Sequence, residues 1–479
     1  MRVFGTLIFL LAVCIDVLGQ DDLYGVPIDF SHVGYRFGDA DIPKYPVTKI
    51  IEAPADGNDA TSLIQDAIEQ VGPGESILLK AGVYNIADRL VVERDSVVLC
   101  GEGESTVIRA LGKNRRSLIT LGKNTNREIQ EGCDIIDQCV SVGQMWVCVD
   151  NASMFKAGDR VLVSFHPNQK WISDIKMDAM MDNPEGTRRH WTPEEYRMSW
   201  ERCVMNIEGD RLWLDNPMVV EMRQENALSM TVRHCSWDRI VESGIENLLL
   251  VSEWDNVNPY DEEHSWTAIE VRAAEHCWVQ AVKSANFAYA LADLRYGAKN
   301  ITVTDCIATD PISIKTGGRR YAFQIASGEL CLVKNCSADH DRHGFLTAAR
   351  TPGPNVFLEC TMTKAYNGMG PHQRWANGVL YDCCITDGLL ELQDRGNWGS
   401  GHGWAGVNFV LWNCVAKTIV CQNPWAHGKN WAVGCVGEKF AGRNHPDNIV
   451  RPDGEWYSTG KHVNPTSLYY YQLETRKNQ

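Results

Sequence analysis

The stretch 332–363, LVKNCSADHDRHGFLTAARTPGPNVFLECTMT, contains two copies of one short pattern. In each copy an apolar run is followed by an acidic or amide residue and then by a cysteine, Cys336 or Cys360. The pattern recurs through the second half of the chain, where its cysteines are Cys277, Cys306, Cys336, Cys360, Cys383, Cys414 and Cys435, at intervals of 29, 30, 24, 23, 31 and 21 residues. Such a period, made of short strands and turns, is typical of a solenoid.

The apolar runs of this repeat predict strands rather than helices. They are short and rich in β-branched residues, and they lack the 3.6-residue spacing of an amphipathic helix. We therefore expect an all-β chain folded as a parallel β-helix, with one coil per repeat. Because cysteine behaves as a small buried hydrophobe, the repeated cysteines should form an unbonded stack inside the coils.

The N-terminal part predicts a cap for this solenoid. Residues 60–70, ATSLIQDAIEQ, form a short amphipathic helix with Leu63, Ile64, Ala67 and Ile68 on one side. Strand-like segments with glycine turns follow it. A helix over the open end of a solenoid covers backbone groups that would otherwise be exposed.

The same region resembles the pectate lyase-like superfamily of secreted right-handed parallel β-helix proteins. The motifs that carry the resemblance are Asp56-Gly57, TSLIQDAI at 61–68, GESILLKAGVY at 74–84 and LCGEG at 99–103. The ending VNPTSLYYYQLETR, 463–476, also resembles the tail of secreted bacterial members. The resemblance extends over residues 50–115 and 236–479 and implies a right-handed solenoid. It does not choose among the lyases, hydrolases and binding proteins that share this fold.

These features divide the chain into five parts. Residues 1–19 have the positive start, short apolar run and small residues of a secretory signal. Residues 20–115 are expected to form the cap and first coils, 116–235 a β-rich insertion, 236–440 the main coils and 441–479 a tail packed on the solenoid. No other segment has 18 uninterrupted apolar residues. We therefore predict a secreted, extracellular monomer without a membrane span.

Secretion brings two further expectations. Asn151, Asn300 and Asn335 begin Asn-X-Ser/Thr patterns for glycosylation. One disulfide is expected within the group Cys133, Cys139 and Cys148, because these residues lie close together in one local segment of an exported chain.

Charge is distributed unevenly along the chain. The net charge of −15 argues against nucleic acid as a partner, yet arginine recurs with aromatic residues before the repeated cysteines. The recurring pairs are Arg295-Tyr296, Arg320-Tyr321, Arg350-Thr351, Arg374-Trp375 and Gly403-Trp404. Equivalent positions of successive coils are roughly 4.8 Å apart, so we expect a basic, aromatic stripe on one face. Arginine pairs with carboxylate or sulfate, which predicts an anionic polysaccharide as the partner.

The predicted reaction is β-elimination on a uronic acid polymer. This step needs a base for the C5 proton and a positive clamp for the carboxylate. We assign the base to His372 or His402, the clamp to Arg350 and Arg374, and an alternative base or acid to His343, because these residues lie in glycine-rich segments in register with the repeat. The predicted substrate-binding residues are Arg295, Tyr296, Arg320, Tyr321, Trp375, Arg395, Trp404 and His427.

Three alternatives remain open. No cofactor is assigned, but a calcium ion is possible if Asp387, Glu391 and Asp394 converge. A glycoside hydrolase of polygalacturonase type would need two acidic residues around the scissile bond, and only faint echoes of its motifs occur, at 305–317 and 401–403. A non-catalytic carbohydrate-binding β-helix would use the same stripe without the histidine chemistry.

Overall fold

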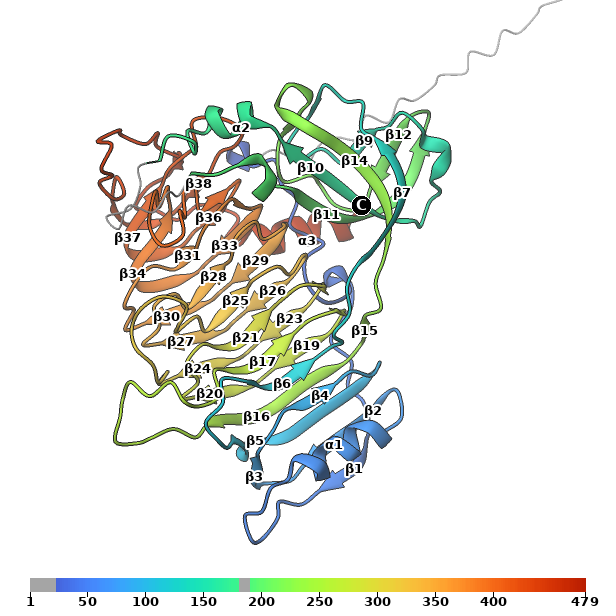
Figure 1. The fold of residues 1–479 in the computed structure, drawn as a ribbon, viewed down its shortest axis with the longest axis vertical. Coiled ribbons are helices and arrows are strands. Elements are labelled where there is room, and N and C mark those ends of the chain that lie inside the picture. The colour runs from blue at the N-terminus through green and yellow to red at the C-terminus, as the bar shows by residue number, and fades with distance from the viewer. Residues whose placement is uncertain (1–22, 181–189) are drawn as a thin grey trace, which may run out of the picture.

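The computed structural model describes residues 23–180 and 190–479, and most of them wind into one right-handed parallel β-helix (Figure 1). Two long parallel sheets run along its axis. The first contains β1 (Val47–Ile51), β2 (Glu75–Leu79), β3 (Gly82–Ile86), β5 (Val97–Ala110), β16 (Gly244–Ser252), β19 (Trp278–Gln280), β20 (Lys283–Ala285), β23 (Thr302–Thr304), β24 (Ile307–Thr309), β26 (Leu332–Lys334), β27 (Ser337–Asp339), β29 (Asn355–Leu358), β30 (Thr361–Thr363), β33 (Val379–Asp382), β34 (Ile385–Leu392), β36 (Val410–Trp412), β37 (Val415–Cys421), β38 (Trp431–Val433), β39 (Val436–Lys439) and β40 (Glu455–Tyr457).

The second long sheet positions the candidate site described below. Its strands are β4 (Leu90–Val92), β6 (Ser117–Leu121), β17 (Thr267–Val271), β21 (Ala290–Leu294), β25 (Phe323–Ile325), β28 (Phe345–Thr347) and β31 (Gly370–Pro371). Short strands complete other coils: β15 (Ile240–Val241), β18 (Ala274–Glu275), β22 (Ala298–Lys299), β32 (Ala376–Asn377) and β35 (Gly406–Val407). Each coil pairs in parallel with the next, which confirms the predicted fold class.

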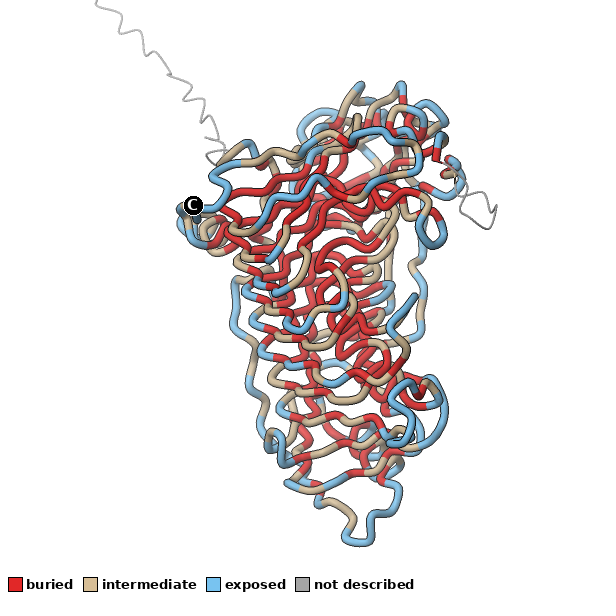
Figure 2. Tube along the Cα trace, turned by 90° about the vertical axis from the view of Figure 1, so that its left-hand side faces the viewer, coloured by how far each residue is buried: buried red, intermediate tan, exposed pale blue. Residues whose placement is uncertain are grey.

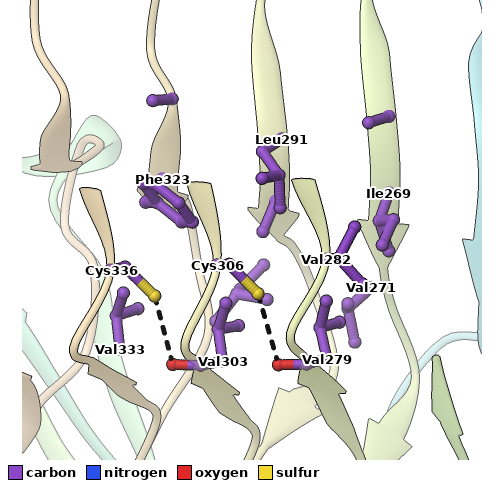
Figure 3. Close-up of a cluster of buried hydrophobic side chains, with 14 of the residues drawn as sticks. Ile269, Val271, Val279, Val282, Leu291, Val303, Cys306, Phe323, Val333 and Cys336 are labelled. Atoms are coloured by element: carbon purple, nitrogen blue, oxygen red, sulfur yellow. Dashed lines mark hydrogen bonds between the residues drawn. The ribbon is translucent and has the colours of Figure 1, made fainter. Parts of the chain in front are cut away.

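The predicted cysteine stack lies in the core of the solenoid. Its members are Cys277, Cys306, Cys336, Cys360, Cys384, Cys414 and Cys435, all buried in the main hydrophobic cluster. Each Sγ donates to a carbonyl of the preceding coil at 3.2–4.0 Å, and Figure 3 shows the bonds of Cys306 to Val279 and of Cys336 to Val303. The stack uses Cys384, where the sequence pattern had pointed to Cys383.

A corner in the left-handed backbone region explains that one-residue difference. The residue before every stacked cysteine has a φ between 48° and 66°, and these residues are His276, Asp305, Asn335, Glu359, Cys383, Asn413 and Gly434. Asn, Asp and Gly tolerate this conformation best. Cys383 occupies the corner of its coil, so its neighbour Cys384 points inward.

Helix α1 (Thr61–Gln70) covers the N-terminal end of the solenoid (Figure 1). Ile64, Ala67 and Ile68 are buried against the first coils as predicted. Leu63 is 47% exposed, so its assignment to the buried side was wrong. Inside the coils the buried residues form a continuous column, whereas the exposed ones lie mainly in the loops (Figure 2).

The insertion leaves the solenoid after β6 and folds as an antiparallel sheet. That sheet contains β7 (Glu128–Asp134), β9 (Trp146–Cys148), β10 (Arg160–Pro167), β11 (Met198–Glu208), β12 (Arg211–Leu214) and β14 (Ala227–Ser236); β8 (Cys139–Val140) and β13 (Met222–Arg223) pair separately, and α2 (Gln169–Asp174) lies between β10 and β11. The insertion packs on the later coils, which are distant in sequence (Figure 1). Trp200 Nε1 donates to Asn377 Oδ1 at 2.9 Å, and Trp191 Nε1 donates to the carbonyl of Gly401 at 3.0 Å.

A buried ion pair fastens the insertion at its root. Arg202 on β11 is fully buried and bonds to Glu329 on the solenoid. Its other terminal nitrogen donates to the carbonyls of Pro217 at 3.0 Å and Gly353 at 3.1 Å. The insertion therefore depends on the coils for both apolar and ionic contacts.

The two described ends of the chain meet on the first sheet. Helix α3 (Leu468–Lys477) bonds to the N-terminal segment, since Gln472 pairs with the backbone of Ile28 and Phe30. Tyr469 Oη also donates to the carbonyl of Val33 at 2.9 Å. Short 3-10 helices occupy Leu23–Gly25, Tyr35–Gly38, Ala152–Met154, Pro193–Glu195 and Gln224–Asn226.

Several sequence expectations concern surface chemistry. All 16 cysteines of the described chain are free thiols, including Cys133, Cys139 and Cys148, so the expected disulfide is not formed. Asn300 is buried and donates to the carbonyls of His32 and Gly34, and it therefore offers no accessible glycosylation acceptor. The predicted signal, 1–19, lies outside the described residues. Within the described ranges, no helix has the length and apolarity needed to cross a membrane.

Candidate functional site

Three predicted histidines gather beside the second long sheet. Tyr321 and His343 stand two residues before the paired strands β25 and β28, His372 directly follows β31, and His402 lies in loop 393–405. The ring centroid of His372 is 4.9 Å from that of His343 and 4.8 Å from that of His402. Tyr321 lies 5.5 Å from His343 and 5.2 Å from His372. We call these four residues the ring cluster.

Both nitrogens of His372 are engaged. Arg395 Nη1 donates to its Nδ1 at 3.0 Å and to its carbonyl oxygen at 2.9 Å. Because Nδ1 accepts, the ring proton is on Nε2, which is 3.2 Å from Tyr321 Oη and donates to it. His372 therefore positions Tyr321 and Arg395, and the predicted role of direct base does not fit its hydrogen bonds.

The Tyr321 hydroxyl oxygen receives several donors. Besides His372 Nε2, the backbone N–H of Gly318 points to it at 3.3 Å and Arg342 Nη1 at 3.5 Å. The guanidinium of Arg342 also lies 5.7 Å from the Tyr321 ring. Donors fixed around one oxygen stabilise negative charge that develops there during a reaction.

All three histidines are kept neutral by their surroundings. Burial, followed by the charge of Arg395, holds the pKa of His343 well below its usual range. Burial and the neighbouring His343 lower the pKa of His372 strongly. Burial and then the guanidinium of Arg395 lower the pKa of His402 to about 3. A neutral imidazole has a free lone pair and can accept a proton.

His402 is the most exposed histidine of the ring cluster. His343 is 1% and His372 9% exposed, whereas His402 is half-buried. Nδ1 of His402 is a buried atom without a hydrogen-bond partner inside the protein, whereas other parts of the ring are exposed. His343 donates through Nδ1 to the carbonyl of Gly368 at 2.5 Å, and its Nε2 lacks a partner inside the protein. Of the two bases first considered, the geometry favours His402.

Cationic and aromatic side chains extend the ring cluster on one side. Trp398, in the same loop as His402, is 46% exposed. The Arg443 guanidinium carbon lies 3.7 Å from the Trp398 ring centroid, and that of Arg395 lies 6.0 Å away. An exposed indole flanked by guanidinium groups suits stacking on a sugar ring that carries a carboxylate. The sequence prediction missed Trp398 and Arg443 because neither is in register with the cysteine repeat.

The predicted clamp residues Arg350 and Arg374 lie next to one another, beside the insertion. The Arg350 N–H donates to the Arg374 carbonyl at 2.8 Å. Arg374 bonds through its side chain to the carbonyls of Ser400 and Gly401, and so supports the loop that carries His402. The Arg350 guanidinium carbon lies 5.3 Å from the Tyr196 ring centroid of the insertion. Arg342 and Arg395 contact the ring cluster more directly than these two.

Several predicted substrate-binding residues are structural. Trp375 and Trp404 are completely buried beneath the insertion, where no sugar can stack on them. His427 pairs with Asp174 at 3.1 Å and Glu221 at 3.2 Å, and thereby joins the insertion to the coils. These three assignments are corrected, because the insertion covers the surface on which they were expected to lie.

The predicted stripe is not one continuous row of arginines. Arg320 is buried and holds the loop before β25 through Ser313 and the carbonyl of His340. Arg295 is half-exposed on its side chain and pairs with Asp293 at 3.1 Å. The exposed Tyr296 ring lies 4.8 Å from Trp237. Among the predicted binding residues, Tyr321 and Arg395 belong to the cluster of histidines.

An acidic pair lies on the same sheet, nearer the N-terminus. Glu270 and Asp293 are paired neighbours on β17 and β21, and Arg295 contacts both, at 3.7 Å and 3.1 Å. Burial raises the pKa of Asp293 to about 7. A carboxyl of raised pKa beside a second acidic residue is a feature of the acid–base pairs of many glycosidases. The sequence prediction missed this pair because its members are separated by 23 residues without a motif.

The calcium ligands suggested by the sequence do not converge. Asp387 accepts the backbone N–H groups of Lys364 and Ala365, and Asp394 is bound to Arg451 at 2.9 Å. Another group, Asp310, Asp339 and His340, brings its ligand atoms within 4.8 Å of one another and could hold a cation. It lies at the start of the loops that carry Tyr321 and His343.

Comparison with known proteins identifies similar architecture only. No protein-family model matches the sequence, and no curated protein matches it. A pectate lyase structure has 9% sequence identity and a TM-score of 0.44, and the match covers 91% of this chain and 84% of the lyase. A polygalacturonase from Erwinia carotovora has 11% sequence identity and a TM-score of 0.42, and the match covers 88% of this chain and 98% of the polygalacturonase. A tailspike of Acinetobacter baumannii bacteriophage AP22, solved in complex with a capsular saccharide, has 10% sequence identity and a TM-score of 0.40. The match covers 80% of this chain, and the chain spans 62% of the length of that tailspike.

These solved structures resemble the chain in general architecture only. The fold is assigned from the strand pairings within the chain itself. The coils, the cap and the stacked inward residues agree with the resemblance carried by the N-terminal motifs. The chain is a right-handed parallel β-helix, the architecture that the N-terminal motifs imply.

Proposed function

We propose that the protein binds an anionic polysaccharide along the outer face of the second long sheet and cleaves it by β-elimination. The observation that carries this proposal is the neutral, half-buried ring of His402 beside His372, among the charges of Arg342, Arg374 and Arg395. A uronic acid carboxylate fits such positive surroundings. Polysaccharide lyases occur among the similar structures, but the proposal rests on this geometry.

The chemistry follows from the positions of these groups. With the carboxylate near Arg342 and Arg395, His402 takes the C5 proton of the uronic acid. The electron pair of the C5–H bond forms a double bond between C4 and C5, and the bond from C4 to O4 breaks. The Tyr321 hydroxyl gives its proton to O4, and the donors around Tyr321 then stabilise the phenolate.

Substrate binding also prepares His402 for this role. The nearby arginines lower its pKa in the free protein, after burial itself. A bound carboxylate offsets their positive charge and makes the imidazole more basic. The base thus becomes stronger when the substrate is in place.

The test uses purified protein and a panel of polyuronates that includes polygalacturonate, alginate and a glucuronate polymer. Ultraviolet absorbance of the unsaturated product and new reducing ends are recorded together, with and without a chelator. Both signals should rise for at least one polymer. His402→Asn should lower the rate by a factor on the order of 10²–10⁴ while polymer binding persists. The exposed His462→Asn is the matched control.

A hydrolase is the second candidate, because Glu270 and Asp293 form a paired acid set. In that case reducing ends would rise without ultraviolet absorbance. Asp293→Asn would then abolish activity and His402→Asn would leave it unchanged. The opposite pattern supports the lyase.

Secretion, independence from calcium and a monomeric state are further parts of the proposal. Export would leave a mature chain that starts at residue 20, which N-terminal sequencing of the exported protein can test. A chelator should leave cleavage unchanged, and light scattering should give the mass of one chain.

A further inference from the structure

We propose that a pocket beside the ring cluster is an additional binding subsite for an acidic sugar unit of the polymer. The pocket has a volume of about 230 Å³ and is lined by the loops after β24, β27 and β30 and by the loop before β17. Its lining residues include Tyr260, Asp310, Lys315, Arg320, His340 and Tyr366. This inference rests on the proposed function, since it extends the same polymer path.

The pocket and the ring cluster share one wall. Arg320 lines the pocket, and the next residue, Tyr321, belongs to the ring cluster. The backbone N–H groups of Arg342 and His343 both donate to the Arg320 carbonyl at 3.1 Å. The Arg320 side chain in turn bonds to the carbonyl of His340 at 3.1 Å. The pocket and the ring cluster are therefore joined through the neighbouring residues Arg320 and Tyr321.

Two exposed tyrosines supply flat surfaces for a sugar ring. Tyr260 is 55% and Tyr366 45% exposed. Lys315 Nζ lies 3.8 Å from the Tyr366 ring centroid, and the Arg320 guanidinium carbon lies 5.6 Å from it. Lys315 therefore places a cation at the Tyr366 ring, and the buried guanidinium of Arg320, held by Ser313 and the carbonyl of His340, adds positive charge behind them. This combination suits a ligand with an apolar sugar face and a carboxylate.

The charge balance of the pocket favours an anion. Lys315 and Arg320 contribute positive charge, and Asp310 contributes a carboxylate at the exposed margin. A second carboxylate close to Asp310, that of Asp339, pairs with Lys364 at 3.5 Å. Asp341, the acid closest to Arg320 in the interior, is fully buried, and burial holds its pKa well above the usual range. The raised pKa favours the uncharged form of the Asp341 carboxyl, so that this group offsets less of the positive charge of Arg320.

The experiment measures retardation of the full-length mature protein in native gels cast with polygalacturonate, alginate, hyaluronate or chondroitin sulfate. The double variant Lys315→Ala/Tyr366→Ala removes the aromatic ring of Tyr366 and the positive charge of Lys315. The matched variant Lys315→Arg/Tyr366→Phe retains both features, and Lys417→Ala removes an exposed lysine elsewhere. His402→Asn is run in parallel.

At least one polymer should retard the wild-type protein, and the alanine variant should bind it about tenfold more weakly. The arginine–phenylalanine and Lys417→Ala variants should bind like wild type, and His402→Asn should lose cleavage but not binding. An alanine variant with wild-type affinity overturns the subsite, even where His402→Asn supports the lyase. Absence of retardation by all four polymers also overturns it. The gels are repeated with a chelator, and loss of wild-type retardation there would also overturn the subsite, because the polymer would then be held through a bound cation.

Discussion

At the residue scale, His402 combines an accessible ring with an environment that keeps it neutral. Its pKa of about 3 is set first by burial and then by Arg395. In the proposed reaction, the neighbouring arginines would therefore have two effects. They would attract the carboxylate of the substrate, and they would keep His402 unprotonated before the substrate binds.

This arrangement predicts the pH profile of the free enzyme. The pKa of His402 is depressed, so the imidazole remains in the proton-accepting form down to about pH 3. The acidic limb of kcat/KM should therefore lie below pH 5, since kcat/KM reports the free enzyme. Initial rates measured from pH 4 to 9 on the polymer identified in the panel provide the check. A limb centred near the usual histidine value of about 6.5 would contradict the assignment.

Tyr321 gives a second prediction at this scale. Tyr321→Phe removes the proton donor for O4 but preserves the ring contacts with His343 and His372. We expect kcat to fall by a factor on the order of 10²–10³ with KM almost unchanged. Tyr457→Phe, on the first sheet, is the control. If kcat of the Tyr321 variant equals that of wild type, another group protonates the leaving oxygen.

At the scale of single elements, the stacked cysteines hold the coils in register through both apolar and hydrogen-bonding contacts. Each thiol fills the core beside a corner residue and donates to the coil before it. The sequence predicted this stack because the spacing of small buried residues follows directly from one coil per repeat. It did not predict which of Cys383 and Cys384 turns inward, because the corner depends on backbone conformation.

Removal of one stacked thiol should produce a measurable loss of stability. Cys336→Ala leaves a small cavity and should lower the free energy of unfolding by about 1 kcal/mol. Urea unfolding followed by tryptophan fluorescence measures the change. The half-buried Cys139, which lies outside the stack, is the site of the control substitution Cys139→Ala. An equal loss of unfolding free energy in the two variants would show that a stacked cysteine stabilises the fold no more than a half-buried cysteine elsewhere.

The insertion depends on a buried charge pair. Arg202→Met leaves Glu329 buried without its main partner and should lower the free energy of unfolding by roughly 3–5 kcal/mol. Adding Glu329→Gln should recover part of that loss, because the unpaired charge disappears. Thermal unfolding of the wild type, of Arg202→Met and of the double variant measures these changes in stability. If the double variant is less stable than Arg202→Met by the full additional loss of a second independent substitution, Arg202 and Glu329 are not energetically coupled.

At the scale of the whole molecule, a chain of net charge −15 is expected to bind a polyanion only through a local positive surface. The affinity of the protein for the polymer that retards it should therefore decrease as the sodium chloride concentration rises from about 0.05 to 0.5 M, since salt screens the attraction between charges. Gel retardation at several salt concentrations measures this. Unchanged affinity would indicate that stacking on Trp398 and the tyrosines dominates.

The architecture was predictable from the sequence, and the composition of the site only in part. Strand length, cysteine spacing and the capping helix are local signals, and the structure confirms them. His372 and His402 share a position relative to the repeat, each twelve residues before a stacked cysteine, and they do come together, with His343 beside them. The buried tryptophans were misassigned because contacts such as Trp200 with Asn377 join residues 177 apart, which no local pattern records.

The hydrogen bond from each stacked thiol reaches only one coil back, and this has a consequence for how such chains diversify. No hydrogen bond in the stack depends on the total number of coils. The chain can therefore be divided into structurally equivalent segments at each stacked cysteine. A segment that runs from one stacked cysteine to the next carries its own corner, its own core residues and its own surface loops. Chimeras joined at equivalent cysteines would exchange entire loop sets, and with them sugar preferences, while the interior remained unaltered.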